Sequence, residues 1–264
     1  MPFTLSHAAA VLPLRRWRIT KSLPLSALII GSMVPDFGFL FGLYDRDLTH
    51  SFLGLLSFCL PVGWITQLLF WHLFRLPLLN LAPRALERRL LALTSMESRN
   101  LWPVSAALLL GALSHVVWDG FTHWSGFISE AVPVLHSIVA VIDGRAIPLC
   151  DVLQHLSSVA GLLVLAVHWH RWASRTTTGE ERAAYFRMLW RAALVCVPLV
   201  VSLLSILLAI PPASLDRVLA RAAGLGLIGG AVCLLVYALS WQLRHKPALR
   251  IARRALGKAQ QRSV

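Results

Sequence analysis

Residues 101–123 read LWPVSAALLLGALSHVVWDGFTH, and this stretch combines the two features that decide the class of the chain. As far as Asp119 it is mostly apolar and long enough to cross the roughly 30 Å hydrocarbon core of a bilayer as a helix. It also carries His115, Asp119 and His123 at intervals of four residues. Because four residues make slightly more than one helical turn, this spacing places the three side chains along one face of a helix.

The whole chain has the composition of a membrane protein. Of its 264 residues, 57% are hydrophobic and only 14% are charged, and the mean hydropathy is +0.67. A soluble domain carries about 25% charged residues and about 45–50% apolar ones. The composition therefore argues against a water-soluble globular enzyme, a disordered chain and a coiled coil.

Five further apolar segments are of similar length. In lipid, a single segment can pair its backbone N–H and C=O groups within itself only as a helix. We therefore predict an all-α fold, a polytopic membrane helical bundle with about six transmembrane helices plus a short N-terminal half-helix. The predicted spans are 23–43, 51–74, 101–119, 156–173, 189–210 and 222–243. The predicted domains are a membrane domain carrying the His/Asp residues (1–188), a C-terminal transmembrane hairpin (189–243) and a basic cytoplasmic tail (244–264).

The basic residues alternate between the two sides of these spans. Segments 1–22, 75–100, 174–188 and 244–264, with the flanking Arg171 and Arg191, hold 21 Lys and Arg. The segments on the other side hold only four, although they include the long loop 120–155. Since Lys and Arg are retained in cytoplasmic loops, both termini should be cytoplasmic and the loop 120–155 should lie outside, with one or two short surface helices.

Two patterns that would indicate nucleic acid or nucleotide in a soluble protein have a simpler explanation here. The formal net charge of +13 is explained by topology and by contact with anionic membrane lipid, so we expect no nucleic acid. The G-x-G-x-x-G pattern at Gly224, Gly226 and Gly229 opens an apolar helix, whereas a dinucleotide site requires a preceding strand. Small residues there allow close packing of helices in lipid.

Asp36 indicates where a polar site lies, because acidic residues within a span are rare and costly and usually face a polar interior. With a rise of about 1.5 Å per residue, Asp36, His115 and Asp119 fall at similar depths in the outer half of the bilayer, and His50 opens the next span at its outer boundary. We therefore predict that these four residues form one cluster.

The position of His7 allows two interpretations. The apolar run 3–14 could be a re-entrant half-helix that brings His7 towards the cluster. Alternatively, it is an amphipathic helix on the cytoplasmic surface with an incidental histidine. The sequence alone slightly favours this second interpretation.

A second pair with a spacing of four residues, Asp151 and His155, lies next to Gln154 at the mouth of the fourth predicted span. We expect Asp151, Gln154 and His155, together with Ser51 and His123, to surround the cluster or to face a substrate.

Five motifs resemble a bacterial integral-membrane family known only as domain of unknown function 4184. They are MPFTLSHAAAVLPL (1–14), LPLSALIIGSMVPDF (23–37), THSFLGL (49–55), GALSHVVWDGFTH (111–123) and LCDVLQHLSSVAGLL (149–163). The resemblance covers about residues 1–245 and extends, more distantly, to inner-membrane metal-dependent hydrolases. It implies a multi-pass protein of the bacterial cytoplasmic membrane, with metal-ligand roles for His7, Asp36, His50, His115 and Asp119.

Two hypotheses of different kinds follow. The first is an integral-membrane hydrolase holding one or two divalent ions, with zinc favoured by the His and carboxylate ligands and with Asp36 or Asp119 as the catalytic base. Its substrate would be a lipid or lipid-linked phosphoester at the outer leaflet. The second is a non-enzymatic membrane protein, a transporter or scaffold with a buried polar His/Asp network. Against transport, the candidates cluster on one side and the two halves show no inverted repeat.

Overall fold

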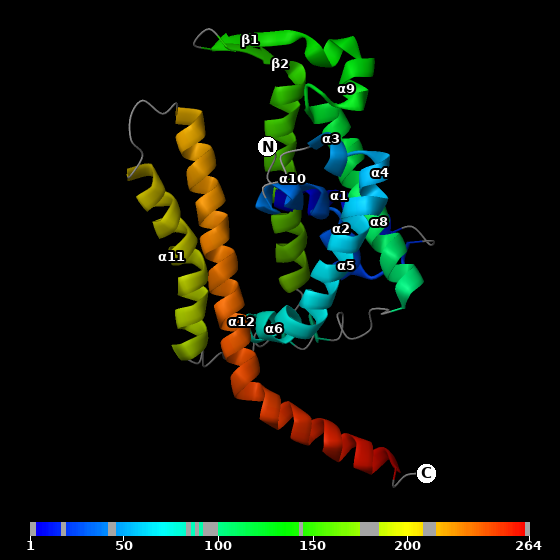
Figure 1. Ribbon diagram of the computed structural model, residues 1–264, viewed down its shortest axis with the longest axis vertical. Helices are drawn as coiled ribbons and strands as arrows, with labels where there is room; N and C mark the ends of the chain where they lie inside the picture. Colours follow the sequence, from blue (N-terminus) through cyan, green and yellow to red (C-terminus); the bar gives the residue numbers. More distant parts are fainter. Residues whose placement is uncertain are drawn as a thin grey trace. The chain divides into compact units, whose positions relative to one another are not determined.

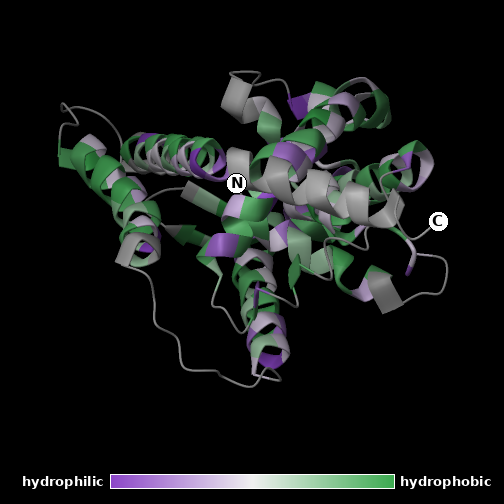
Figure 2. Ribbon diagram, turned by 90° about the horizontal axis from the view of Figure 1, so that it is seen from below, coloured by the Kyte–Doolittle hydropathy of each residue, from purple (hydrophilic) through white to green (hydrophobic). Residues whose placement is uncertain are grey.

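The computed structural model describes residues 4–16, 20–41, 46–82, 86–87, 90–91, 100–142, 145–174, 185–207 and 215–261. Helices dominate the described residues (Figure 1), and apolar side chains predominate along the long ones (Figure 2). Five helical segments are long and apolar enough to cross a membrane: Phe52–Leu81, Leu101–Thr122, Leu149–Ala173, Met188–Leu207 and Gly224–His245. The predicted class, an all-α polytopic membrane protein, is confirmed.

The chain forms two compact units, and each is described by itself. Unit 1 comprises Met1–Leu68 and Leu91–Thr177, and unit 2 comprises Leu69–Leu90 and Thr178–Val264. The helices of unit 1 are η1 (Thr4–His7), α1 (Ala8–Val11), η2 (Pro13–Arg16), α2 (Leu25–Gly31), η3 (Val34–Phe41), α3 (Arg46–Thr49), α4 (Phe52–Gly54), η4 (Leu55–Cys59), α5 (Leu60–Leu69), α8 (Leu101–Thr122), α9 (Phe127–Ala131), η6 (Pro133–His136) and α10 (Leu149–Ala173). Those of unit 2 are η5 (Phe70–Phe74), α6 (Arg75–Leu81), α11 (Tyr185–Leu207) and α12 (Leu215–Gln261).

Helices α2 and α8 touch through their backbones. A Cβ atom built on Gly31 would lie 2.2 Å from the carbonyl oxygen of Leu108, and one built on Gly111 would lie 2.3 Å from that of Leu28. Since no side chain fits in such a gap, only glycine permits this approach. The contact brings Ser32, at the end of α2, beside the second half of α8.

The first predicted span, 23–43, differs from the prediction. Over the described residues 20–41 it consists of α2 and the 3₁₀ helix η3, which are separate short helices. Pro35 lacks a backbone N–H and therefore cannot donate the α-helical hydrogen bond to the Gly31 carbonyl, whereas as the second residue of η3 it needs no donor. Helix α2 ends at Ser32, whose hydroxyl donates to the carbonyl of Ile29 at 2.8 Å. Hydropathy alone did not reveal this break, because the residues on both sides of it are apolar.

The N-terminal segment is buried within unit 1, which supports the half-helix interpretation over the surface helix. Elements η1 and α1 pack against α10, and α1 also contacts α8. Ser6 lies so close to Gly161 of α10 that a Cβ atom there would approach the Ser6 Cβ to 2.9 Å. His7 is 3% exposed, so its side chain faces the interior of the unit.

The loop predicted for residues 120–155 contains the expected short helices, α9 and η6, and also a hairpin that was not predicted. Strand β1 (Ile138–Ile142) pairs antiparallel with β2 (Arg145–Pro148), with Ile142 opposite Arg145. The sequence signal was available: a β-branched run precedes the dipeptide Asp143-Gly144, which is typical of hairpin turns. Within β1, Ile138 and Val141 are 51% and 66% exposed.

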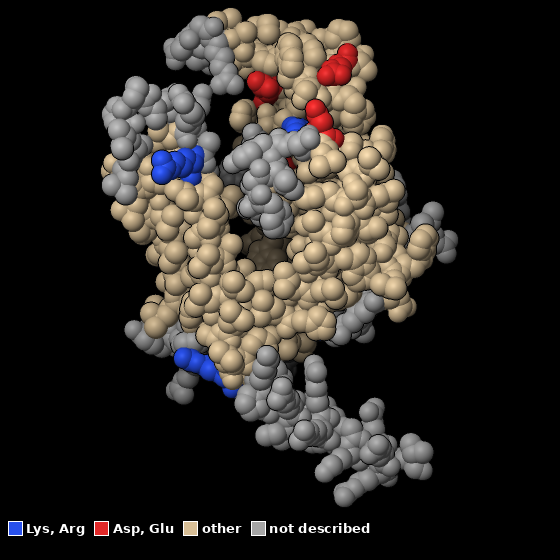
Figure 3. Space-filling model, in the orientation of Figure 1, with Lys and Arg blue, Asp and Glu red and all other residues tan. Residues whose placement is uncertain are grey.

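In unit 2, α11 and α12 pack along each other. A Cβ atom on Gly226 would lie 3.0 Å from the Pro198 carbonyl oxygen, and one on Gly229 would lie 3.2 Å from a methyl group of Val201. Gly226 and Gly229 therefore serve close helix packing, as predicted from their position in an apolar helix, whereas a Cβ atom on Gly224 would meet nothing within 4 Å. Helix α12 continues past the predicted span to Gln261. Charged side chains are sparse on the described part of the face drawn in Figure 3.

Candidate metal centre

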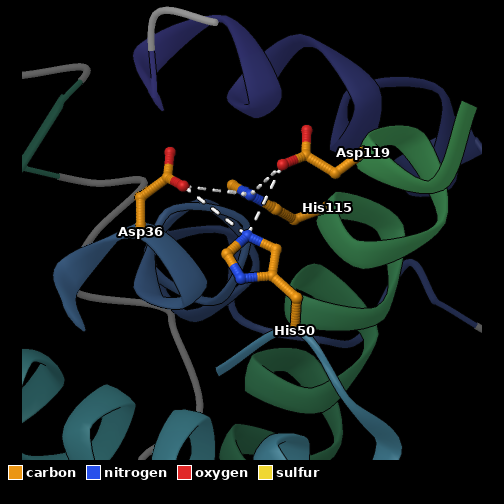
Figure 4. Close-up of side chains that lie close together, drawn as sticks. All are labelled: Asp36, His50, His115 and Asp119. Atoms are coloured by element: carbon orange, nitrogen blue, oxygen red, sulfur yellow. Dashed lines mark ion pairs between the residues drawn. The ribbon is translucent and has the colours of Figure 1, made fainter. Parts of the chain in front are cut away.

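Four side chains of unit 1 converge on one point (Figure 4). Asp36 comes from η3, His50 from the junction of α3 and α4, and His115 and Asp119 from successive turns of α8. One ligand atom from each lies within 4.8 Å of the others. These are the four residues that the depth argument placed in one layer. Their assignment as metal ligands is a proposal, taken up below.

The spacing of the four groups suits an ion better than direct hydrogen bonds. His50 Nε2 lies 3.4 Å from Asp119 Oδ2 and 3.7 Å from Asp36 Oδ1. His115 Nε2 lies 3.5 Å from the same two oxygens. Nitrogen-to-oxygen hydrogen bonds span about 2.7–3.2 Å. Two ligand atoms at zinc bond lengths of about 2.0–2.2 Å and a tetrahedral angle are separated by roughly 3.3 Å.

Several of the converging atoms are buried without a hydrogen-bond partner among the described residues. They are Nε2 of His50, Nε2 of His115 and Oδ1 of Asp119, together with Nε2 of the adjacent His7. Each buried unsatisfied polar atom costs about 1–3 kcal/mol. Such atoms gathered at one point fit a cation that they would share, and the donor set of imidazole and carboxylate fits zinc.

The histidine rings are held so that Nε2 faces the cluster. His115 Nδ1 lies 2.7 Å from the carbonyl oxygen of Ser32, which can only accept, so Nδ1 carries the proton. His50 Nδ1 lies 2.9 Å from Thr49 Oγ1, and that hydroxyl donates to the Arg46 carbonyl at 3.4 Å. The hydroxyl oxygen therefore accepts from His50 Nδ1. With the proton on Nδ1, the neutral form of each ring has its lone pair on Nε2, the atom that faces the cluster and that a metal ion would use.

His7 lies beside this group of four. Its ring stacks on that of His115 with the centroids 3.7 Å apart, and its Nε2 is 3.5 Å from Asp119 Oδ1. Burial lowers the pKa of His7 from its ordinary value to about 4, with a further contribution from His115. The imidazole is therefore neutral at neutral pH and has a lone pair to offer an ion.

His123 and Gln154 meet on the outer side of Asp119. His123 Nδ1 lies 3.6 Å from Asp119 Oδ2 and 3.3 Å from the Asp119 carbonyl oxygen. The Gln154 amide nitrogen, from α10, donates to His123 Nε2 at 3.1 Å. Burial lowers the pKa of His123 to about 4, so this ring is also neutral. The contacts connect α10 to the backbone and carboxylate of Asp119.

For the other three residues predicted around the cluster, the structure gives local contacts or exposure. Ser51 caps α4, because its hydroxyl accepts from the Gly54 backbone N–H at 2.9 Å and donates to the Leu48 carbonyl at 3.0 Å. Asp151 lies in the first turn of α10, with Oδ1 3.9 Å from the Cys150 sulfur. His155 is exposed on the same helix. A substrate-facing role for these three stays a prediction.

Two residues at the site were missed by the sequence analysis. Arg46 Nη2 forms an ion pair with Asp119 Oδ2 at 2.7 Å. Thr4 Oγ1 donates to Asp36 Oδ2 at 2.6 Å. Arg46 left a usable signal, since it is one of the few basic residues on the predicted outer side and precedes His50 by four residues. Thr4 left none, because one hydroxyl among apolar residues is unremarkable.

A pocket adjoins the cluster and shares Arg46 and His50 with it. Its volume is about 160 Å³. Its lining is Arg46, Asp47, His50, Val116, Gly120, Ser125, Gly126 and Phe127. The wall thus combines two charged side chains with apolar ones, directly beside the converging ligand atoms.

Fold and site together define an integral-membrane helical protein with a buried His/Asp cluster able to hold a metal ion. The family model described as domain of unknown function (DUF4184) matches residues 1–239, and the chain belongs to this family. No curated protein and no solved structure matches the chain.

Proposed function

We propose that this protein is an integral-membrane metal-dependent hydrolase of the bacterial cytoplasmic membrane. Asp36, His50, His115 and Asp119 would hold a divalent ion, zinc by preference, and the substrate would be a lipid or lipid-linked phosphoester at the outer leaflet. The observation that carries the proposal is the convergence of buried ligand atoms without hydrogen-bond partners beside a pocket.

A divalent ion in this position supplies Lewis acidity, which polarises a phosphoryl oxygen and lowers the pKa of a water molecule. The carboxylates of Asp36 and Asp119 differ in their ability to accept a proton from a water molecule. Asp36 Oδ2 already accepts from the Thr4 hydroxyl at 2.6 Å. Asp119 Oδ1 has no hydrogen-bond partner among the described residues, so it is the oxygen better placed to take up a proton. We therefore favour Asp119 Oδ1 as the general base, with Oδ2 of the same carboxylate as its ligand atom, and Asp36 as a ligand held by Thr4.

A lipid substrate is favoured by the surroundings of the pocket. Phe127 lines the pocket and is 50% exposed, and Trp124, three residues earlier, is 53% exposed. Aromatic side chains prefer the boundary between lipid and water. The apolar, exposed strand β1 follows in the same segment. Such a segment suits the membrane interface, where a phosphoester head group would meet the pocket.

Metal content provides the first test. The full chain would be purified in mild detergent with a tag free of histidine and without chelators, and analysed by elemental mass spectrometry. We expect about one or two zinc ions per chain. His115→Ala should lose the zinc, whereas the matched variant His168→Ala, which removes an exposed histidine of the same unit outside the predicted site, should keep it. A folded parent without zinc, unresponsive to added zinc, would contradict the proposal.

Activity provides the second test and separates the two hypotheses. Phospholipid vesicles would be incubated with the zinc-loaded protein, and water-soluble phosphoesters and diacylglycerol would be quantified. Release by the parent and by His168→Ala, abolished in Asp119→Ala, supports a hydrolase. Stoichiometric zinc without hydrolysis of any lipid phosphoester would favour a transporter or scaffold.

A further inference from the structure

Arg46 occupies the junction between the His/Asp cluster and the pocket. It is the first residue of α3, and its side chain is 25% exposed. Nη2 contacts Asp119 Oδ2 at 2.7 Å, while the residue also lines the pocket. A guanidinium carries five N–H donors and stays protonated at any working pH. One side chain therefore connects the carboxylate of the cluster to the space where a substrate would lie.

The charges around this junction favour a singly negative ligand. Asp36 and Asp119 contribute two negative charges, and Arg46 contributes one positive charge. Histidines that coordinate a metal ion are neutral, so one divalent ion held here would leave the assembly with one positive charge in excess. An uncompensated charge in a partly buried site is costly, and a monoanion removes it. The carboxylate of Asp47 is exposed at the pocket, where water and salt screen it.

The shape of the pocket restricts which part of a ligand enters. Its volume of about 160 Å³ is smaller than the roughly 300–1,000 Å³ of pockets that enclose whole drug-sized ligands. Gly120 and Gly126, which both line the pocket, are in backbone contact, because a Cβ atom on Gly126 would clash with the Gly120 carbonyl oxygen. A phosphoryl group with its nearest substituent fits this space, whereas lipid chains would remain outside.

We propose that Arg46 is the substrate-binding residue for a phosphodiester, with its guanidinium holding an anionic phosphoryl oxygen in the pocket beside the metal site. The inference rests on the proposed function and narrows its substrate class to monoanionic phosphodiesters. A phosphodiester has the single negative charge that the assembly lacks, and the planar guanidinium matches two phosphoryl oxygens. A neutral carboxylic ester offers neither.

Binding of diethyl phosphate, a soluble monoanionic diester, tests this. Isothermal titration calorimetry would be performed on the zinc-loaded full chain in detergent, with zinc measured for every variant. Arg46→Gln should keep its zinc and bind diethyl phosphate at least about tenfold more weakly, since a charged hydrogen bond is lost. Arg46→Lys keeps the charge but loses the planar pair of donors that can bind two oxygens. Its affinity for diethyl phosphate should lie between those of Arg46→Gln and the parent. Arg171→Gln, which removes an exposed arginine that does not line the pocket, should remain within about twofold of the parent.

Three results would overturn the inference. One is an Arg46→Gln variant that keeps zinc and binds diethyl phosphate within twofold of the parent. Another is a zinc-loaded parent that does not bind diethyl phosphate. The third is loss of zinc from both Arg46→Gln and Arg46→Lys, which would make Arg46 a residue that only positions Asp119. A parent lacking zinc would instead overturn the proposed function, so the two failures are distinguishable.

Discussion

Each compact unit contains a buried polar contact, and the two contacts differ in whether the chain completes them. In unit 2, the Tyr237 hydroxyl donates to the Pro77 carbonyl at 3.1 Å and accepts from Asn80 Nδ2 at 3.0 Å. In unit 1, Nε2 of His50 and of His115 face carboxylates at 3.4–3.7 Å and have no hydrogen-bond partner among the described residues. The first contact needs no group from outside the chain and is explained by its role in the structure. The second would be completed by the cation that we propose.

The helices that carry these contacts differ in the same sense. Of the apolar window of α8, 39% is buried within the chain, against 6% for α11 in unit 2. Helix α8 supplies His115 and Asp119 and is enclosed by α2, α10 and the N-terminal segment. Apolar character alone would not distinguish the two helices. Two of the four cluster residues, His115 and Asp119, therefore lie on the candidate span with the largest buried share.

The largest expected effect on zinc affinity comes from Asp119, in the polar contact of unit 1. Asp119→Asn removes a ligand oxygen and a negative charge, so zinc affinity should fall by at least about 100-fold, the upper range for residues that only orient ligands. Competition with a chromophoric zinc chelator measures this. Asn80→Ala, in the polar contact of unit 2, should leave the zinc affinity unchanged. Equal zinc affinities of Asp119→Asn and the parent would remove the distinction between the two contacts.

Removing the metal should destabilise the parent through unit 1. At free zinc 100 times the dissociation constant, binding to the folded state alone contributes about 2.7 kcal/mol. For a chain of this size that corresponds to a rise in Tm of roughly 5–10 °C. Tryptophan fluorescence during heating in detergent, with and without zinc, measures the shift. His115→Ala should show none, and a Tm of the parent insensitive to zinc would count against the ion.

A smaller effect on zinc affinity is expected for Thr49, which contacts His50 but does not belong to the cluster. Thr49→Val removes the hydroxyl that fixes His50 Nδ1, and zinc affinity should fall by about tenfold. Thr49→Ser, which keeps the hydroxyl, should stay within about threefold of the parent. The chelator competition distinguishes them. If Thr49→Val and Thr49→Ser bound zinc equally, the orientation of His50 would not depend on this hydrogen bond.

Removing a hydrogen bond from the polar contact of unit 2 should change the stability of the protein but not its zinc content. Tyr237→Phe leaves the Asn80 amide and the Pro77 carbonyl without the hydroxyl, so the free energy of unfolding should fall by about 1 kcal/mol. Denaturation in detergent measures the change, and the zinc content should match that of the parent. A variant that lost zinc would show that this contact supports the metal site as well.

The sequence predicted the cluster better than the chain path around it. Asp36, His115 and Asp119 were recognisable because ionisable residues are conspicuous in apolar segments and helical rise fixes their depth. Arg46 was missed because its ion pair with Asp119 crosses between elements far apart in the sequence. The break before Pro35 was missed because hydropathy averages over a backbone interruption. The hairpin was missed because its apolar run was interpreted only as surface helix.

The contact of Gly31 with Gly111 links distant positions to the orientation of a ligand. It sets the distance between α2 and α8, and thereby brings the Ser32 carbonyl to 2.7 Å from His115 Nδ1. A methyl group at either glycine would separate the helices and withdraw that carbonyl. In the evolutionary record of the family, we therefore expect these two glycines to vary as little as His115 itself, although neither belongs to the cluster.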